Sequence, residues 1–250
     1  LVHINGKCVT FFCICPFTRT LSYGIMILIN LNADRKHSGM RIRGFRMKKV
    51  LFAASECVPF IKTGGLADVC GALRNSLIKG MGCSCSHSEL FLYPGEYRNK
   101  FEYVTHFYMG TGPYIPSKYV GVLKYELDGI TYYFIDNQEY FNCFLPYGDI
   151  RYDIEKFTFF DKAVLSMLPQ IGFQPDIIHC HDWQAGLIPV FLKTEFQGDM
   201  FFWGMKAIMT IHNLKFQGVW DVKTMMGLTG FPEKNSLHRI NWSSRKMQIC

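Results

Sequence analysis

The strongest constraint on the fold is residues 47–73 (MKKVLFAASECVPFIKTGGLADVCGAL), in which an apolar run, a glycine-containing loop and an amphipathic segment follow one another. Residues 49–55 form a near-continuous apolar run, which is typical of a strand covered on both faces of a parallel sheet. Leu66, Val69 and Leu73 then recur at helical spacing, which predicts a helix over residues 66–79. Because such a helix packs back on its strand, the segment predicts one unit of an α/β fold.

The rest of the chain continues this alternation of strands and helices. We predict strands at residues 101–109, 119–136 (a hairpin turning at 127–129), 175–181 and 206–211, and helices at 155–168, ended by Pro169, and 184–196. The fold class is therefore α/β, a Rossmann-like sandwich with a mostly parallel sheet. The pattern fails at residues 83–96, where small polar residues (CSCSHS) occupy the place of an apolar strand, so a second strand is in doubt there.

Charge and cysteine placement exclude several classes of protein. The formal net charge is +7, but seven of the 27 Lys/Arg and one of the 20 Asp/Glu lie in residues 1–46. The remaining residues are nearly balanced, so the folded part has no general attraction for nucleic acid. The ten cysteines stand singly without a CxxC pair, which favours buried, reduced thiols in a cytoplasmic protein over a disulfide framework.

Residues 1–46 are interpreted as a non-domain N-terminal extension. Their apolar stretch, residues 21–31, is shorter than the roughly twenty residues that span a bilayer, and it lacks the flanks of a secretory signal. We therefore predict no membrane partner. The domain is expected over residues 47–235, disrupted at about 83–96, with a divergent tail at residues 236–250.

Three polar loops follow predicted strands, and in open parallel sheets ligands gather at the carboxyl ends of the strands. In the first loop (PFIKTGGLADV), Gly64 and Gly65 allow a close approach to the backbone, and the next helix directs unpaired N–H groups to the same place. Lys62 adds a positive charge, so the loop suits a phosphate, although a tight turn with a solvated lysine explains it equally well. Neither GxGxxG nor GxxxxGK[ST] is present, which argues against dehydrogenases and P-loop proteins. Asp68 either complements the helix dipole or faces a sugar hydroxyl.

The second loop (HCHDWQA) crowds His179, His181 and Asp182. Alternation along the strand puts both histidines on one side and Asp182 on the other, and without a third ligand at a recognisable spacing we predict no metal site. His181 is expected to hydrogen-bond a polyhydroxylated ligand or a neighbouring carbonyl, and Trp183 to stack on the ligand or to join the core.

The third loop (IHNLKFQGVW) carries His212, Asn213 and Gln217. Amide side chains are frequent partners of sugar hydroxyls, but they are equally frequent in ordinary loops. This loop is weak support for a sugar ligand when it is taken alone.

In combination and in this order, the motifs KVLFAASECVPFIKTGGLADVCGAL, PDIIHCHDWQAGLIPVFLK and TIHNLKFQG resemble the N-terminal catalytic domain of bacterial glycogen synthases and plant starch synthases. These are the ADP-glucose-dependent enzymes of glycosyltransferase family five. The resemblance covers residues 47–233 apart from the interruption. It implies the N-terminal half of a GT-B glycosyltransferase, with the active site between two Rossmann-like domains. It also implies transfer of glucose from ADP-glucose to the nonreducing end of an α-1,4-glucan (glycogen), with retention of configuration.

The resemblance also implies roles for individual residues. Lys62 would lie beside the donor phosphates, and Gly64 and Gly65 would direct N–H groups to them. Asp68 matches the family's motif aspartate and His181 the histidine that approaches the donor glucose, so these two are the candidate catalytic residues. The candidate substrate-binding residues are Asp182, Trp183, His212, Asn213 and Gln217. No cofactor and no metal are implied, because basic side chains neutralise the leaving ADP.

Two stretches, residues 83–96 and 236–250, depart from the family pattern, and no counterpart of the family's C-terminal domain follows. That domain carries the family's arginine, lysine and glutamate that hold most of the nucleotide sugar, so we expect activity to require it. The alternative function is an inactive fragment or a noncatalytic glucan-binding domain of the same ancestry. A UDP-glucose enzyme of the same fold, such as a sucrose synthase-like transferase, is a further alternative.

Overall fold

The computed structural model describes residues 48–77, 82–86, 97, 100–142, 145–231 and 246–248, together with three short strands near the N-terminus. These strands are β1 (Val2–Ile4), β2 (Lys7–Val9) and β3 (Ile25–Met26). β1 pairs with β2, whereas β3 pairs antiparallel with Thr210 and Ile211 of the main sheet. Residues 25–26 thus join the sheet although they belong to the segment expected to lie outside the domain. The predicted boundaries at residues 46/47 and 235/236 lie outside the described residues.

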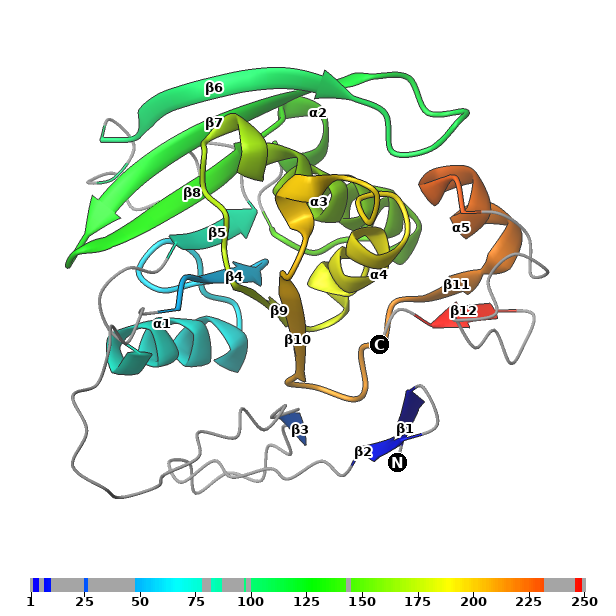
Figure 1. Ribbon diagram of the computed structural model, residues 1–250, viewed down its shortest axis with the longest axis horizontal. Coiled ribbons are helices and arrows are strands. Elements are labelled where there is room, and N and C mark those ends of the chain that lie inside the picture. The colour runs from blue at the N-terminus through cyan, green and yellow to red at the C-terminus, as the bar shows by residue number, and fades with distance from the viewer. Residues whose placement is uncertain are drawn as a thin grey trace.

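An eight-stranded mixed sheet runs through the molecule in the order β3-β10-β9-β4-β5-β8-β7-β6 (Figure 1). After β3 its strands are β4 (Val50–Ala54), β5 (Gly82–Ser86), β6 (Glu102–Met109), β7 (Lys118–Leu127), β8 (Ile130–Asp136), β9 (Ile177–His181) and β10 (Lys206–Ile211). β10, β9, β4, β5 and β8 are parallel, and β7 and β6 add an antiparallel edge. The predicted α/β class with a mostly parallel sheet is therefore confirmed.

The second strand, which the sequence left in doubt, is present as β5. It pairs in parallel with β4 on one side and with β8 on the other. The doubt rested on the missing apolar alternation, but a central strand is also held by backbone hydrogen bonds along both of its edges, which any non-proline residue can make. Residues 87–96, the rest of the predicted interruption, lie outside the described part of the chain.

The helices are α1 (Gly65–Leu77), α2 (Gln138–Phe141), α3 (Ile150–Gln170), α4 (Ile188–Lys193) and α5 (Val222–Thr229). Short 3-10 turns lie at η1 (Trp183–Ala185) and η2 (Met200–Phe202), and β11 (Val219–Asp221) pairs with β12 (Lys246–Gln248). α3 begins five residues before the predicted start, because the Asp149 side chain caps it by accepting the N–H of Arg151. It also includes Pro169 in its last turn. The helix predicted at residues 184–196 is instead divided into η1 and α4.

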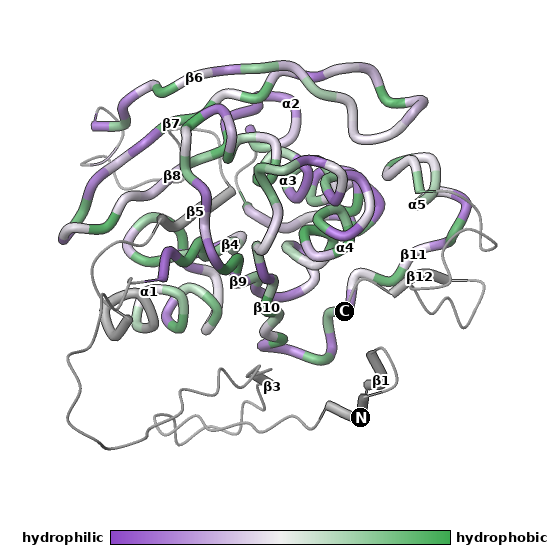
Figure 2. Tube along the Cα trace, in the orientation of Figure 1, coloured by the Kyte–Doolittle hydropathy of each residue, from purple (hydrophilic) through white to green (hydrophobic). Residues whose placement is uncertain are grey.

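Helices cover the parallel strands on both faces, with α1 on one side and α3 and α4 on the other (Figure 1). Phe52 and Ala54 of β4 belong to the smaller hydrophobic cluster, which includes Leu66 and Cys70 of α1. Leu51 and Ala53 of β4 belong to the larger cluster, which also contains residues of α3 and α4. Hydrophobic residues accordingly recur along the central strands and these helices (Figure 2). The near-continuous apolar run of β4 thus reflects burial on both faces.

Candidate functional site

The three polar loops predicted from the sequence meet at one edge of the sheet. β4, β9 and β10 are adjacent and parallel, with Ala53 opposite Cys180 and His181 opposite Thr210. The loops that follow these strands therefore start side by side at the carboxyl edge, where ligands of such sheets bind.

The first loop brings Lys62 and Asp68 together. The Lys62 ammonium lies 2.8 Å from a carboxylate oxygen of Asp68, and both side chains are about half exposed. An exposed ion pair of this kind contributes about 0–1 kcal/mol, so Lys62 can leave Asp68 for another anion at little cost. Both predicted residues of this motif are thus accessible to a ligand.

Gly64 and Gly65 have no structural need for glycine within the described chain. Neither has a positive φ, and no described atom lies within 4 Å of a Cβ built at either position. The side chains that they lack would therefore point into open space rather than into the protein. The backbone at both positions is therefore open to the close approach of an external group.

Glu56 is a member of this site that the sequence reasoning missed. The residue is 3% exposed, and its carboxylate accepts the N–H groups of Thr63 and Gly64, the latter at 3.2 Å. The Gly64 N–H, which was expected to face a phosphate, is therefore already engaged. The sequence shows only an acidic residue two positions after a buried strand, and such a residue is usually interpreted as a solvated loop residue.

The second loop places His179 and His181 against each other, as the alternation of the strand predicts. Their ring centroids are 4.2 Å apart, and Phe52 lies against both. Nε2 of His179 is hydrogen-bonded to Oγ1 of Thr210 at 2.7 Å. Burial lowers the pKa of His179 to about 4, so this ring is neutral at pH 7.

His181 is fully buried and pairs with His212 across the two strand ends. Nδ1 of His181 lies 2.9 Å from Nε2 of His212, and the two rings are stacked. Burial lowers the pKa of both rings, so one neutral imidazole donates to the other. Nε2 of His181 has no hydrogen-bond partner among the described residues. The His181–His212 contact thus fixes one nitrogen of His181, while the other is buried without a partner among the described residues.

Asp182 and Trp183 support this arrangement from inside the protein. The Asp182 carboxylate accepts the His212 backbone N–H at 2.6 Å, and the Asp182 backbone N–H donates to the Thr210 carbonyl. Asp182 therefore ties the end of β9 to the end of β10. Trp183 is 5% exposed and packs edge-on against Phe157, which is the core placement that the sequence left open.

The third loop uses its polar side chains locally. Asn213 Oδ1 accepts the Lys215 N–H at 3.0 Å, and Gln217 Nε2 donates to the Leu214 carbonyl at 2.6 Å. Asn213 is exposed and Gln217 partly exposed, so both lie near the surface of the loop.

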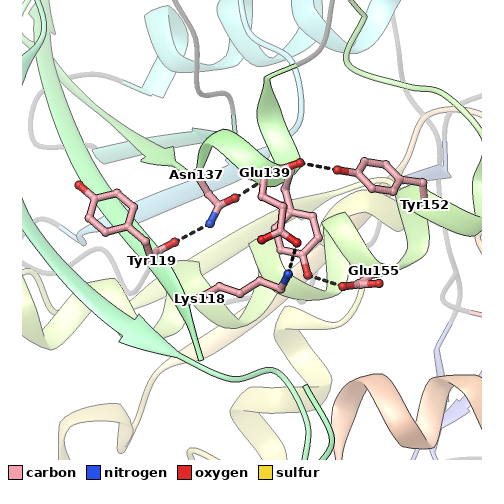
Figure 3. Close-up of polar contacts among 7 residues, drawn as sticks. Lys118, Tyr119, Asn137, Glu139, Tyr152 and Glu155 are labelled. Atoms are coloured by element: carbon pink, nitrogen blue, oxygen red, sulfur yellow. Dashed lines mark hydrogen bonds and ion pairs between the residues drawn. The ribbon is translucent and has the colours of Figure 1, made fainter. Parts of the chain in front are cut away.

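A polar cluster that the sequence did not single out ties β7 and β8 to α2 and α3 (Figure 3). It consists of Lys118, Tyr119, Asn137, Glu139, Tyr140, Tyr152 and Glu155. Asn137 caps α2 by accepting the Tyr140 N–H at 2.9 Å, and the Tyr140 hydroxyl donates to Glu155 on α3. The cluster holds α2 beyond the carboxyl end of β8.

Two further properties of the described residues bear on what the chain can bind. Within the described ranges, no group of three or more His, Cys, Asp and Glu side chains is arranged to hold a metal ion. No helix in the same part of the chain combines the length and the apolar character needed to cross a membrane.

Comparison with known proteins identifies relatives of this chain. Residues 49–249 match the family described as the starch synthase catalytic domain. Glycogen synthases of Lachnoclostridium phytofermentans and Lachnospira eligens are 54% and 53% identical over 75% of this chain. The glycogen synthase of Clostridium botulinum strain Alaska E43 is 45% identical over 73% of it. The chain spans only 38–39% of the length of these relatives.

A solved structure shares the fold. The catalytic domain of starch synthase IV from Arabidopsis thaliana, bound to ADP and acarbose, matches with a TM-score of 0.65 at 24% identity, over 82% of this chain and 42% of that one. The match supports the predicted GT-B type of Rossmann-like fold. With the family match and the curated relatives, it leads to one conclusion: the chain belongs to the starch synthase catalytic domain family, the glycosyltransferases that include the bacterial glycogen synthases.

Proposed function

We propose that the chain forms one wall of the donor site of a glycogen synthase, which transfers glucose from ADP-glucose to the nonreducing end of an α-1,4-glucan with retention of configuration. One observation carries the proposal. The loop with Lys62, Gly64 and Gly65 opens at the same sheet edge as a buried histidine, His181, that keeps one nitrogen without a partner among the described residues. The related starch synthase IV was solved with ADP and acarbose, so a member of this fold holds a nucleoside diphosphate and a sugar mimic.

Lys62 and Gly65 are proposed to face the donor diphosphate. Cleavage of a glycosyl phosphate develops negative charge on the leaving ADP, and fixed N–H donors and a lysine stabilise that charge where it appears. Gly65 is the first residue of α1, whose initial N–H groups have no acceptor within the helix. Lys62 would exchange Asp68 for a phosphate oxygen, and Gly64 would contribute space rather than its N–H.

His181 is proposed to contact the donor glucose through Nε2, which is buried in this structure and would be reached once the donor enters the site. If His212 donates to Nδ1 of His181, Nε2 carries the proton and can donate to a sugar hydroxyl; in the other tautomer Nε2 accepts. Asp68, released from Lys62, would accept a hydroxyl of the same sugar. Asp182, Trp183 and His212 would act by holding His181 in place, and Asn213 and Gln217 would contact the substrates from the rim.

We further propose that turnover needs residues from the larger part of the relatives' length that this chain does not span. Basic side chains would neutralise the charge of the leaving ADP, so the proposed reaction needs no metal. We also propose a cytoplasmic location. The domain division expected from the sequence, with a core at residues 47–235, belongs to it as well.

Two measurements test the proposal. The purified chain is incubated with radiolabelled ADP-glucose and glycogen, and its thermal unfolding is followed with ADP-glucose or UDP-glucose present. Preferential heat protection by ADP-glucose, lost in Lys62→Met, is the expected result, with little or no incorporation into polymer. Glycogen binding without ADP-glucose protection would favour a noncatalytic glucan-binding domain, and preferential protection by UDP-glucose would indicate a different donor. Clear incorporation by the chain alone would refute the need for further residues.

A further inference from the structure

Glu56 has four hydrogen-bond donors and lies at the base of the Lys62–Gly65 loop. Oε2 accepts the backbone N–H groups of Thr63 and Gly64, and Oε1 accepts the hydroxyls of Thr63 at 2.8 Å and Tyr147 at 2.5 Å. A carboxylate offers about four lone-pair sites, so this one is fully used. A buried charge is tolerated only with such partners, which makes the arrangement a built feature of the fold.

The contacts of Glu56 close the loop on itself. The chain leaves β4 at Ala54, and Cys57 bridges to Ile61, whose N–H donates to the Cys57 carbonyl at 3.1 Å. Glu56 then ties the start of the loop to its last two residues before α1. The Glu56 carboxylate therefore helps to fix the direction in which Lys62 and Gly65 face.

Tyr147 anchors Glu56 to the opposite side of the sheet edge. Its hydroxyl lies between Glu56 and Ser55, 2.6 Å from Oγ of Ser55. Burial and the neighbouring Glu56 raise the pKa of Tyr147, so the hydroxyl keeps its proton and donates.

The segment around Tyr147 is itself fixed to α3. Nζ of Lys156 donates to the Pro146 carbonyl, and the Gly148 N–H donates to the Asp153 carboxylate, both at 2.8 Å. Lys156 and Asp153 form a buried ion pair at 2.6 Å. Through Tyr147, Glu56 is thus linked to the segment that α3 fixes, and in turn it holds the loop.

We propose that Glu56 is a positioning residue for the donor diphosphate, acting through the loop and with Tyr147 as its anchor. The inference rests on the function proposed above. Glu56 takes the N–H groups of Thr63 and Gly64 and so leaves Lys62 and the start of α1 to face the phosphates. The negative charge of Glu56 would by itself repel a diphosphate and weaken binding. Removing the charge should therefore strengthen ADP binding if Glu56 acts only through its charge, and weaken it if Glu56 positions the loop.

The experiment measures ADP affinity by calorimetry, amide exchange at Thr63 and Gly64, and thermal unfolding, all on the full chain. Glu56→Gln keeps the shape but replaces an acceptor oxygen by an NH₂ group that cannot accept these donors. We expect it to weaken ADP binding by about tenfold or more and to speed exchange at both amides. Tyr147→Phe should act in the same direction, by about threefold.

Tyr140→Phe is the matched control, because it removes a buried tyrosine hydroxyl from a glutamate on α3, away from this loop. It should lower thermal stability as Tyr147→Phe does, but leave ADP affinity and the two amides unchanged. Glu56→Gln binding ADP as tightly as the wild type, or more tightly, would overturn the inference. Should the wild-type chain not bind ADP, the proposed function fails for this chain, and amide exchange decides the positioning role: unchanged exchange at Thr63 and Gly64 in Glu56→Gln would overturn it.

Discussion

Acidification should destabilise the protein through the buried imidazole of His179. His179 is 8% exposed, and burial, helped by the neighbouring His212, lowers its pKa from an ordinary 6.5 to about 4. Because the folded-state pKa is depressed, the unfolded chain takes up the proton first as the pH falls. The contribution of His179 is therefore complete above about pH 6.5 and is lost as the pH falls towards 4.

The size of the effect follows from the two pKa values. The difference between 6.5 and about 4 corresponds to about 3 kcal/mol at full extent, of which about 2 kcal/mol is lost between pH 7 and pH 5. His181 and His212, whose pKa values are also lowered by burial, add to the loss. Asp161 and Asp182 act in the opposite direction, because burial raises the pKa of both carboxyls.

A variant isolates the share of His179. His179→Gln keeps a side-chain amide for Thr210 but does not titrate in this range. Urea unfolding followed by tryptophan fluorescence at pH 7, 6 and 5 gives the free energy of unfolding at each pH. The loss between pH 7 and 5 should be smaller in the variant by about 2 kcal/mol. Equal losses in the two proteins would refute the argument that His179 is buried in its neutral form.

Three further predictions concern single residues. Gly218→Ala should lower the free energy of unfolding in urea by about 2 kcal/mol or more, because the φ of Gly218 is 57° and a Cβ would lie 2.5 Å from the Trp183 ring. Gly204→Ala is the control: its φ is 79°, but no described atom lies within 4 Å of the Cβ, so it should cost only about 1 kcal/mol. Similar costs for the two would disprove the steric part of this reasoning. Asp221→Ala should cost about 1 kcal/mol, because the carboxylate caps α5 by accepting the Thr224 N–H at 2.9 Å; an unchanged urea midpoint would contradict it. Lys62→Met should weaken ADP binding in calorimetry by about tenfold and change stability by less than about 1 kcal/mol; a large loss of stability would mean that the lysine acts in folding.

The strand, loop and helix at the start of the domain could be read from the sequence because the signal is local. β4 is buried on both faces and therefore apolar throughout, and the helical spacing from Leu66 onward places α1 within two residues of its observed bounds. The hairpin turn is predicted for the same reason, because an Asp-Gly pair favours a turn whose two central residues have a positive φ. Asp128 and Gly129 both adopt a positive φ.

The connections within the site could not be read in the same way. Glu56 is buried because Tyr147, 91 residues further along the chain, reaches it, and no local pattern announces that contact. His181 and His212 were both placed at strand ends, but their pairing depends on the register of β9 against β10. Asn213 and Gln217 each form a hydrogen bond within their own turn, so their contact with a sugar, suggested by residue type, stays a prediction.

The outermost strand, β6, also has a consequence for how the molecule meets its own copies at high concentration. It ends the sheet and exposes Tyr103, Val104 and Tyr108, so its outer backbone is a template on which a second molecule could add a strand. The register shift between Tyr103 and Thr105 interrupts that template. Only the run from Thr105 to Met109 is regular, so the bulge shortens the stretch of edge on which a second strand could pair and thereby works against fibril growth.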